Sequence, residues 1–317
     1  MRPFKNLLLL ISAVLVFHSC SKEESSLSQE EQQELEQVNL AARQSAKQLY
    51  DDYYLASKSV TADVPWSGDE ASCESGDVPQ ATMDKILMRL AYFRKAAGLN
   101  NTILENTTKS EKAQDAALMM KSNGTLSHSP PNSWSCFSES GKEGAGNSLL
   151  TQVRNAEAID SYVRDQGSDN GPVGHRRWLL WPKLQEIGIG NTDATNAIWV
   201  LGNAGTPPAD APEFISWPPE GHTPKQLAYP RWSFSIASAD FTGASITMKD
   251  GNNQVISLEI EELNNQFGDR TIVWVPAINT NVLTEDTTYT ITISDVEIDD
   301  QMETFDYQIT LFDVNQE

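Results

Sequence analysis

The feature that most constrains the fold is a change of hydrophobic pattern near Pro230. Before this residue, apolar side chains recur every three or four positions, which is typical of amphipathic helices. After it, β-branched and aromatic residues alternate with polar ones, and this predicts strands. Tyr289 begins one of these runs after a turn, a placement typical of immunoglobulin-like sandwiches. The pattern predicts an α+β protein ending in an immunoglobulin- or fibronectin-like β-sandwich over 231–317. Its strands are expected at 232–236, 244–248, 255–260, 271–275, 289–293 and 306–312.

The region before Pro230 is expected to combine helices with a small sheet. Thr82 is the expected N-cap of one helix, and Gly124 is the expected stop of another. The glycine-rich segment 141–147 predicts a loop with close backbone approach, and the proline-rich segment 206–230 predicts a surface connector. The expected helices are 35–54, 82–97, 110–121 and 159–166, and the expected strands are 186–191 and 197–202.

Length and charge limit the possible functions. A chain of 317 residues is long enough for about two domains. Its net charge of −21 excludes unassisted nucleic-acid binding, because phosphate contacts require cations. The same charge disfavours electrostatic docking on anionic lipid.

The first twenty residues indicate export. Arg2 and Lys5 precede an apolar run over 7–17 that is too short to span a membrane. Cys20 follows a small residue at the end of this run, which resembles the cleavage site of bacterial lipoproteins. Residues 1–19 are then a signal peptide, Cys20 is the lipidated first residue, and 20–36 is a flexible tether. An ordinary secretory peptide with an incidental cysteine is the alternative.

The expected location is the bacterial outer membrane or cell surface. Ser21–Glu24, a lysine followed by two acids, resembles the surface-export signal of some Gram-negative lipoproteins. The membrane is thus an expected partner through the lipid anchor, not through charge.

Cys73 and Cys136 are the two cysteines that remain in the mature chain. An oxidising compartment would pair them, and a bridge closing a loop of this length stabilises a fold by about 4 kcal/mol. Two free buried thiols are the alternative.

Most motifs that carry chemistry are absent from the sequence. It contains no G-x-S-x-G elbow, P-loop, H-E-x-x-H or G-x-G-x-x-G. Two histidines, His128 and His175, lie where predicted elements end, whereas His222 lies in the proline-rich segment and is expected in a solvated loop.

One stretch resembles a known family. Gly174–Trp181, followed by Lys183 and Ile187–Gly190, is similar to the signature of the CAP superfamily of cysteine-rich secretory, antigen-5 and pathogenesis-related-1 proteins. Arg94–Leu99 resembles the end of the family's first helix, although Ala91 replaces an asparagine. The resemblance implies a CAP-type α-β-α sandwich, here over 37–205.

The resemblance also implies a pocket with two histidines and two glutamates. His128 and His175 match the histidines, Gly146 stands at the first glutamate, and the shorter Asp165 stands at the second. Glu143 is close enough in sequence to substitute for the first. The implied ligand-binding cleft contains His128, Glu143, Asn147, Asp165 and His175.

Two classes of function fit these residues. Two histidines with a carboxylate can bind a divalent metal, so zinc at His128 and His175 is a possible cofactor; the alternative is a hydrogen-bonded pair with a structural role. The preferred function is binding of an extracellular or envelope ligand. The alternative is a metal-assisted or His/Asp-based hydrolase of envelope or extracellular polymers, for which no catalytic residue is assigned.

Overall fold

The computed structural model describes residues 28–60, 63, 65–202 and 204–316. The chain divides into two compact units, residues 1–39 and 40–317. The expected signal peptide, Cys20 and residues 21–27 of the expected tether lie outside the described residues. Both regions that the sequence predicted as separate domains belong to the second unit.

Helix α1 spans Gln29–Leu49 and therefore begins within the segment predicted as a flexible tether. Its start is a capping box: the Glu31 carboxylate accepts from Ser28 N at 2.8 Å, and Glu31 N donates to Ser28 Oγ at 3.3 Å. The Glu- and Gln-rich sequence, taken as a tether because it lacks apolar residues, is also rich in good helix formers. A π-helical turn, Tyr50–Leu55, follows. Among the described residues, no helix has the length and apolarity needed to cross a membrane.

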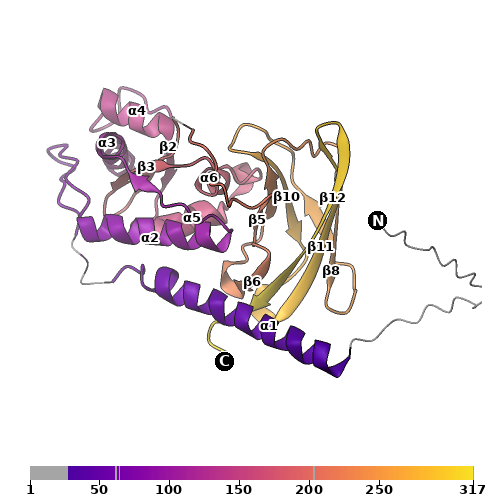
Figure 1. Cartoon of the computed structure of the whole chain (residues 1–317). Coiled ribbons are helices and arrows are strands. Elements are labelled where there is room, and N and C mark those ends of the chain that lie inside the picture. The colour runs from indigo at the N-terminus through magenta and orange to yellow at the C-terminus, as the bar shows by residue number, and fades with distance from the viewer. Residues whose placement is uncertain (1–27, 61–62, 64, 203, 317) are drawn as a thin grey trace, which may run out of the picture. The chain divides into compact units, whose positions relative to one another are not determined.

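A four-stranded sheet forms the middle layer of the region up to residue 202 (Figure 1). Its order is β1-β3-β4-β2, with β1 parallel to β3 and the other neighbours antiparallel. Helices α3 and α4 pack on one face, and α2 and α5 pack on the other. The strands are β1 (Leu104–Glu105), β2 (Ser148–Thr151), β3 (Glu186–Asn191) and β4 (Asn196–Trp199). The helices are α2 (Gln80–Ala96), α3 (Thr107–Asn123), α4 (Glu139–Asn147), α5 (Glu157–Arg164) and α6 (Gly174–Leu179).

The ends of the helices differ in part from the expectation. Thr82 lies inside the first turn of α2, which begins after Pro79, so it is not the N-cap. Asn106 caps α3 by accepting from Lys109 N, and Gly124 ends it with a φ of +62°, as predicted. The latter position needs glycine because other side chains rarely adopt this conformation.

Helix α4 corrects the predicted loop over 141–147. Ser138 caps the helix and accepts from Gly141 N at 2.9 Å. The expected close approach is confirmed at Gly144, where a Cβ would lie 2.1 Å from the Lys112 carbonyl oxygen of α3. The glycines therefore allow two helices to pack closely, and they do not form a loop.

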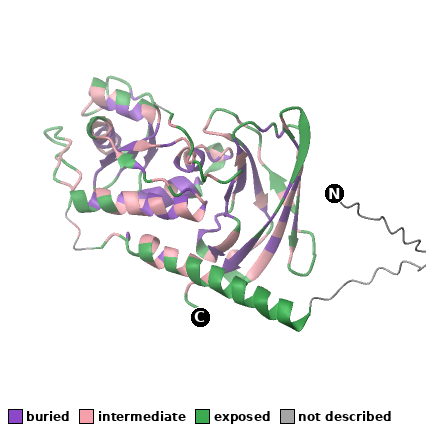
Figure 2. Ribbon diagram, viewed as in Figure 1, coloured by how far each residue is buried: buried purple, intermediate pink, exposed green. Residues whose placement is uncertain are grey.

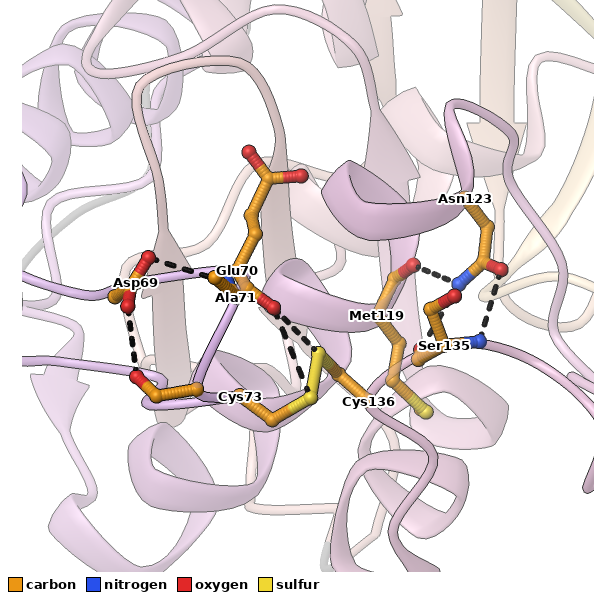
Figure 3. Close-up of a disulfide and its surroundings, with 9 residues drawn as sticks. Asp69, Glu70, Ala71, Cys73, Met119, Asn123, Ser135 and Cys136 are labelled. Atoms are coloured by element: carbon orange, nitrogen blue, oxygen red, sulfur yellow. Dashed lines mark hydrogen bonds between the residues drawn. A yellow bond between two sulfur atoms is a disulfide. The ribbon is translucent and has the colours of Figure 1, made fainter.

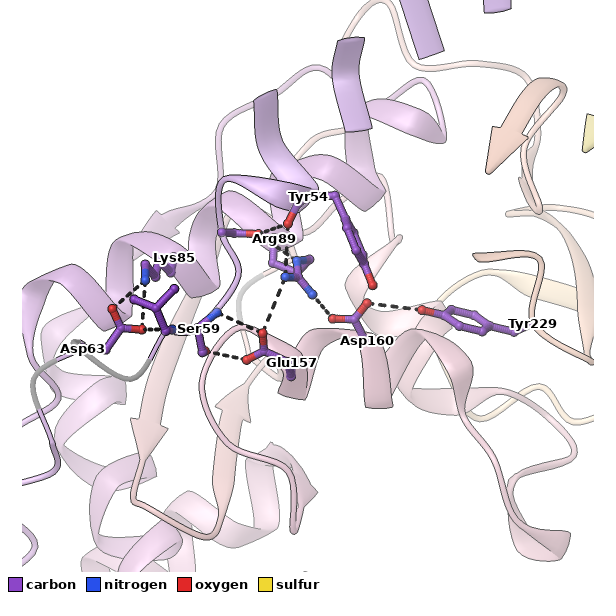
Figure 4. Close-up of polar contacts among 10 residues, drawn as sticks. Tyr54, Ser59, Asp63, Lys85, Arg89, Glu157, Asp160 and Tyr229 are labelled. Carbon is purple, nitrogen blue, oxygen red and sulfur yellow. Dashed lines mark hydrogen bonds and ion pairs between the residues drawn. The ribbon is translucent and has the colours of Figure 1, made fainter. Parts of the chain in front are cut away.

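The opposite face of the sheet contains larger side chains and a buried ionic network (Figure 4). Arg89 of α2 pairs with Asp160 of α5 and donates to Ser57 Oγ at 2.7 Å. Tyr229 donates to Asp160 at 3.3 Å. Burial raises the pKa of the Asp160 carboxyl, and the Arg89 charge opposes that shift. The network joins the segment after α1 to α2, α5 and the chain just before Pro230.

Two further four-stranded sheets follow, with orders β5-β7-β10-β9 and β6-β12-β11-β8. The six predicted strands correspond to β7–β12, although β9 covers only the second half of the predicted strand 255–260. Buried residues of both sheets belong to one core cluster, and Figure 2 shows buried positions along their strands. The strands are β5 (Ile215–Trp217), β6 (Gly221–Pro224), β7 (Trp232–Ile236), β8 (Ser245–Asp250), β9 (Leu258–Ile260), β10 (Arg270–Pro276), β11 (Thr287–Ile298) and β12 (Gln301–Phe312).

The expected surface connector over 206–230 is replaced, from Ile215 on, by structured chain. β5 pairs with β7, and β6 pairs with β12. Trp217 is 1% exposed and lies 5.1 Å from the Phe93 ring of α2, measured between ring centroids. Prolines at strand ends explain the misprediction, because proline is tolerated at such positions. His222 lies on β6 and is half-buried, so it is not the solvated loop residue that was expected.

Candidate functional site

A cleft of about 370 Å³ opens beside the carboxyl end of α4 and the start of α6. Its lining combines two histidines with several apolar side chains and comes from both the N-terminal and the C-terminal regions of the second unit. Three of the predicted cleft residues, His128, Asn147 and His175, line it. The full lining is His128, Gly146, Asn147, Ser148, Leu149, Asp169, Asn170, Pro172, Gly174, His175, Trp178, Val200, Leu201 and Phe267.

His175 is oriented by a buried carboxylate. Asp165 ends α5 with a left-handed φ of +50°, and its side chain is fully buried. Its Oδ1 lies 2.8 Å from His175 Nδ1, and its Oδ2 accepts from His175 N at 2.8 Å. A carboxylate only accepts, so Nδ1 carries the proton and Nε2 remains available to a ligand. Asp165 thus lies behind the cleft and fixes the histidine that lines it.

His128 is held more simply. It lies in the loop between α3 and α4, and its Nδ1 is 3.0 Å from the carbonyl oxygen of Ala145. A carbonyl also only accepts, so the proton lies on Nδ1 and Nε2 is again free. His128 is exposed. Among the described residues, no carboxylate forms a hydrogen bond with its imidazole.

The loop that carries His128 is fastened by a disulfide (Figure 3). Cys73 and Cys136 are bonded, with Cα atoms 5.1 Å apart, which confirms the predicted bridge. Asn123 and Ser135 exchange two hydrogen bonds at 3.0 and 3.1 Å and tie the same loop to the end of α3. One end of the His128 loop is therefore fixed covalently.

Neither Glu143 nor the residue at position 146 places a carboxylate beside His128. Glu143 pairs with Lys112 of α3 at 2.7 Å and does not line the cleft. At Gly146 a Cβ would have His128 O as its nearest neighbour, at 3.5 Å. A side chain could therefore be accommodated where the resemblance places a glutamate.

Sequence reasoning missed several lining residues. Asp169 and Asn170 belong to a 3₁₀ turn, Ser168–Asn170, whose polar sequence gave no signal beyond that of a loop. Trp178 lies within the recognised signature, and its position there was the available signal. Phe267 comes from the C-terminal sandwich, and no local pattern could place it here.

Zinc at His128 and His175 remains a prediction. Among the residues that the structure describes, no three His, Cys, Asp or Glu side chains form a group that could hold a metal ion. Two imidazole nitrogens are free, whereas both Asp165 oxygens already accept hydrogen bonds. These donors alone do not make a complete zinc site.

Residues 87–201 match the family model described as CAP, the cysteine-rich secretory protein family. The chain therefore contains a CAP domain, as the motif resemblance predicted. A DUF4426 family protein from Pseudomonas aeruginosa PAO1 is a structural match with 19% identity, covering 26% of this chain and 72% of that chain. Its TM-score is 0.20, so no argument rests on it. No curated protein matches the chain.

Proposed function

We propose that this protein is an exported, lipid-anchored CAP-domain protein that binds a small envelope or extracellular ligand in the cleft. The observation that carries the proposal is the lining: apolar side chains surround a histidine whose orientation is fixed. Ligand sites typically combine an apolar surface with a few precisely placed polar groups. The ligand is therefore a molecule with an apolar body and a group that hydrogen-bonds to His175 Nε2.

Export and anchoring are supported by the disulfide and by the N-terminal sequence. Disulfides persist in oxidising compartments, and the Cys73–Cys136 bridge is consistent with one. The proposed location is the outer membrane or cell surface, with Cys20 as the lipidated residue. Mass spectrometry of the native N-terminal peptide should show acyl mass, and an unmodified Cys20 would refute the anchor. As part of this proposal, the two C-terminal sheets form an immunoglobulin- or fibronectin-like sandwich.

Binding can be tested with anilinonaphthalene sulfonate, a fluorescent dye with an apolar body and an anionic group. The protein is the mature chain carrying Cys20→Ser, so that no acyl group competes for the dye. We expect one dye molecule per chain and a loss of roughly tenfold in affinity for Leu201→Glu, which places a charge in the apolar lining. Val153→Glu is the matched control, because Val153 is exposed and outside the cleft. Equal losses in both variants would contradict binding in the cleft.

A hydrolase is the second candidate, favoured by the His175–Asp165 pair. A histidine oriented by a buried carboxylate can act as a general base. Incubation with isolated envelope polymers should then release soluble fragments, and His175→Ala should abolish the release. Release that is unchanged in His175→Ala would exclude this mechanism.

A further inference from the structure

A loop of the C-terminal sandwich reaches the cleft. Residues 264–269 form the last part of the connection between β9 and β10, and Phe267 among them lines the cleft. Arg177 of α6 donates to the carbonyl oxygens of Asn264 and Asp269, at 2.6 and 2.7 Å. Trp181 Nε1 donates to the Asp269 carboxylate at 2.8 Å. The loop is therefore fastened to the end of α6, the helix on which His175 lies.

The fit between this loop and α6 is close. A Cβ on Gly174 would lie 2.9 Å from the Phe267 ring, and a Cβ on Gly268 would lie 3.0 Å from Arg177 O. Gly268 also has a left-handed φ of +46°, which favours glycine. These contacts leave little room for the Phe267 ring to move relative to His175, as is required of residues that line a binding site.

A second contact holds the chain segment between α5 and α6. Arg231, just before β7, donates to the carbonyl oxygens of Asp165 and Gly167 at 3.0 and 2.9 Å. Its Nε donates to Glu261 beside β9 at 2.6 Å. The sandwich thus contacts the start of the segment that supplies Asp169, Asn170 and Pro172 to the cleft.

Phe267 itself lacks the surroundings of a structural core residue. It is partly exposed and belongs to none of the three hydrophobic core clusters found among the described residues. A large apolar side chain held rigidly at the rim of a cleft, without a core of its own, offers its surface to a ligand.

We infer that the C-terminal sandwich completes the ligand cleft and that Phe267 determines the size of the apolar group that the cleft accepts. This inference rests on the proposed binding function. It assigns the sandwich a direct role in recognition, because the part of the lining that Phe267 supplies would be missing without it.

The test compares two dyes of the same chemistry, anilinonaphthalene sulfonate and its covalent dimer. Phe267→Ala should widen the cleft and raise the affinity for the dimer relative to the monomer by roughly tenfold. Phe267→Trp should lower the same ratio, and it keeps an aromatic ring against α6 in case the alanine variant does not fold. Leu263→Ala is the matched control, because Leu263 is exposed near the same loop and does not line the cleft.

The outcomes separate this inference from the proposed function. If the unmodified protein binds neither dye, both fail. If it binds the monomer but neither Phe267 variant changes the ratio, the cleft binds without size selection by Phe267 and the inference alone is wrong. A shift in Leu263→Ala as large as that in Phe267→Ala would also overturn it, since the effect would then come from the loop in general. Opposite shifts in the two Phe267 variants, with none in Leu263→Ala, support it.

Discussion

The two histidine-bearing sides of the cleft are held by different means. His128 lies on a loop that is held by the Cys73–Cys136 disulfide, and its imidazole contacts a backbone carbonyl. His175 lies at the start of α6, and its imidazole contacts a buried carboxylate that also accepts a hydrogen bond from the backbone N–H of His175. One side is restrained covalently and loosely oriented, whereas the other is restrained by many non-covalent contacts and closely oriented.

This difference indicates which side dominates recognition. An oriented imidazole loses less conformational freedom when a ligand binds, so its contact contributes more to affinity. The His175 side also receives the contacts from the C-terminal sandwich through Arg231 and Phe267. We therefore expect substitutions around His175 to change binding more than equivalent substitutions around His128.

The largest expected effect is loss of the disulfide. Cys73→Ser/Cys136→Ser frees two positions 63 residues apart in sequence and should lower the free energy of unfolding by about 4 kcal/mol in the chain-entropy description. Urea denaturation measures this change, and the reduced unmodified protein serves as a control that should match the variant. Amide exchange should rise over 125–137 and remain unchanged over 165–175. Equal exchange on both sides would contradict the view that they are fastened independently.

Asp165→Asn tests the His175 side. The amide keeps the size of the side chain but removes the charged acceptor and sets an NH₂ group against His175 Nδ1, so that hydrogen bond survives only if the imidazole takes its other tautomer; the expected cost is about 1.5–3 kcal/mol. The counterpart, His128→Ala, removes an exposed side chain with one contact and should change stability by about 0.5 kcal/mol or less. Denaturation of both variants gives the comparison, and similar losses would refute it.

Two glycines provide a finer comparison of the same sides. Gly174→Ala places a methyl group 2.9 Å from the Phe267 ring and should cost about 1–2 kcal/mol as the ring shifts. Gly146→Ala adds a methyl group at an ordinary contact distance, 3.5 Å, from His128 O within the last turn of α4 and should stabilise the protein by about 0.5–1 kcal/mol. The melting temperature should therefore fall in Gly174→Ala and rise in Gly146→Ala. A stabilising Gly174→Ala would show that the Phe267 loop is not seated on α6.

Much of the fold could be predicted from patterns that are local in sequence. The strands after Pro230 and the helix ending at Gly124 follow from alternation and from capping, and both are present. The predictions failed where tertiary contacts decide the outcome. Glycines at 141–147 indicate a loop by propensity, but close packing of α4 on α3 makes them helical. Trp217 lies in a proline-rich segment, yet it is buried against α2.

The candidate site was predictable to the extent that its residues lie in segments that resemble one family. His128, Asn147 and His175 line the cleft as the family resemblance implied. The same resemblance gave Asp165 but could not tell that it orients His175 from behind the cleft. Phe267 was not predictable, because its place depends on how a separate pair of sheets packs on α6, and a single sequence contains no local signal for that packing.

The smallest expected effect concerns zinc. A carboxylate added beside His128 would make that side of the cleft resemble the His175 side, where Asp165 contacts the imidazole. Gly146→Glu places a carboxylate at the position where the resemblance implies one, and its Cβ would be in ordinary contact with His128 O at 3.5 Å. With the two free Nε2 atoms it would supply a third donor, and zinc affinity should rise about tenfold, equivalent to about 1.4 kcal/mol. Calorimetric titration at neutral pH measures this, since the imidazoles must be unprotonated to bind. Gly146→Gln is the matched control, because it has the same shape without the charge. The gain should disappear when His128→Ala and His175→Ala are added. A gain that survives in that background would place the metal outside the cleft and leave both histidines to hydrogen bonding.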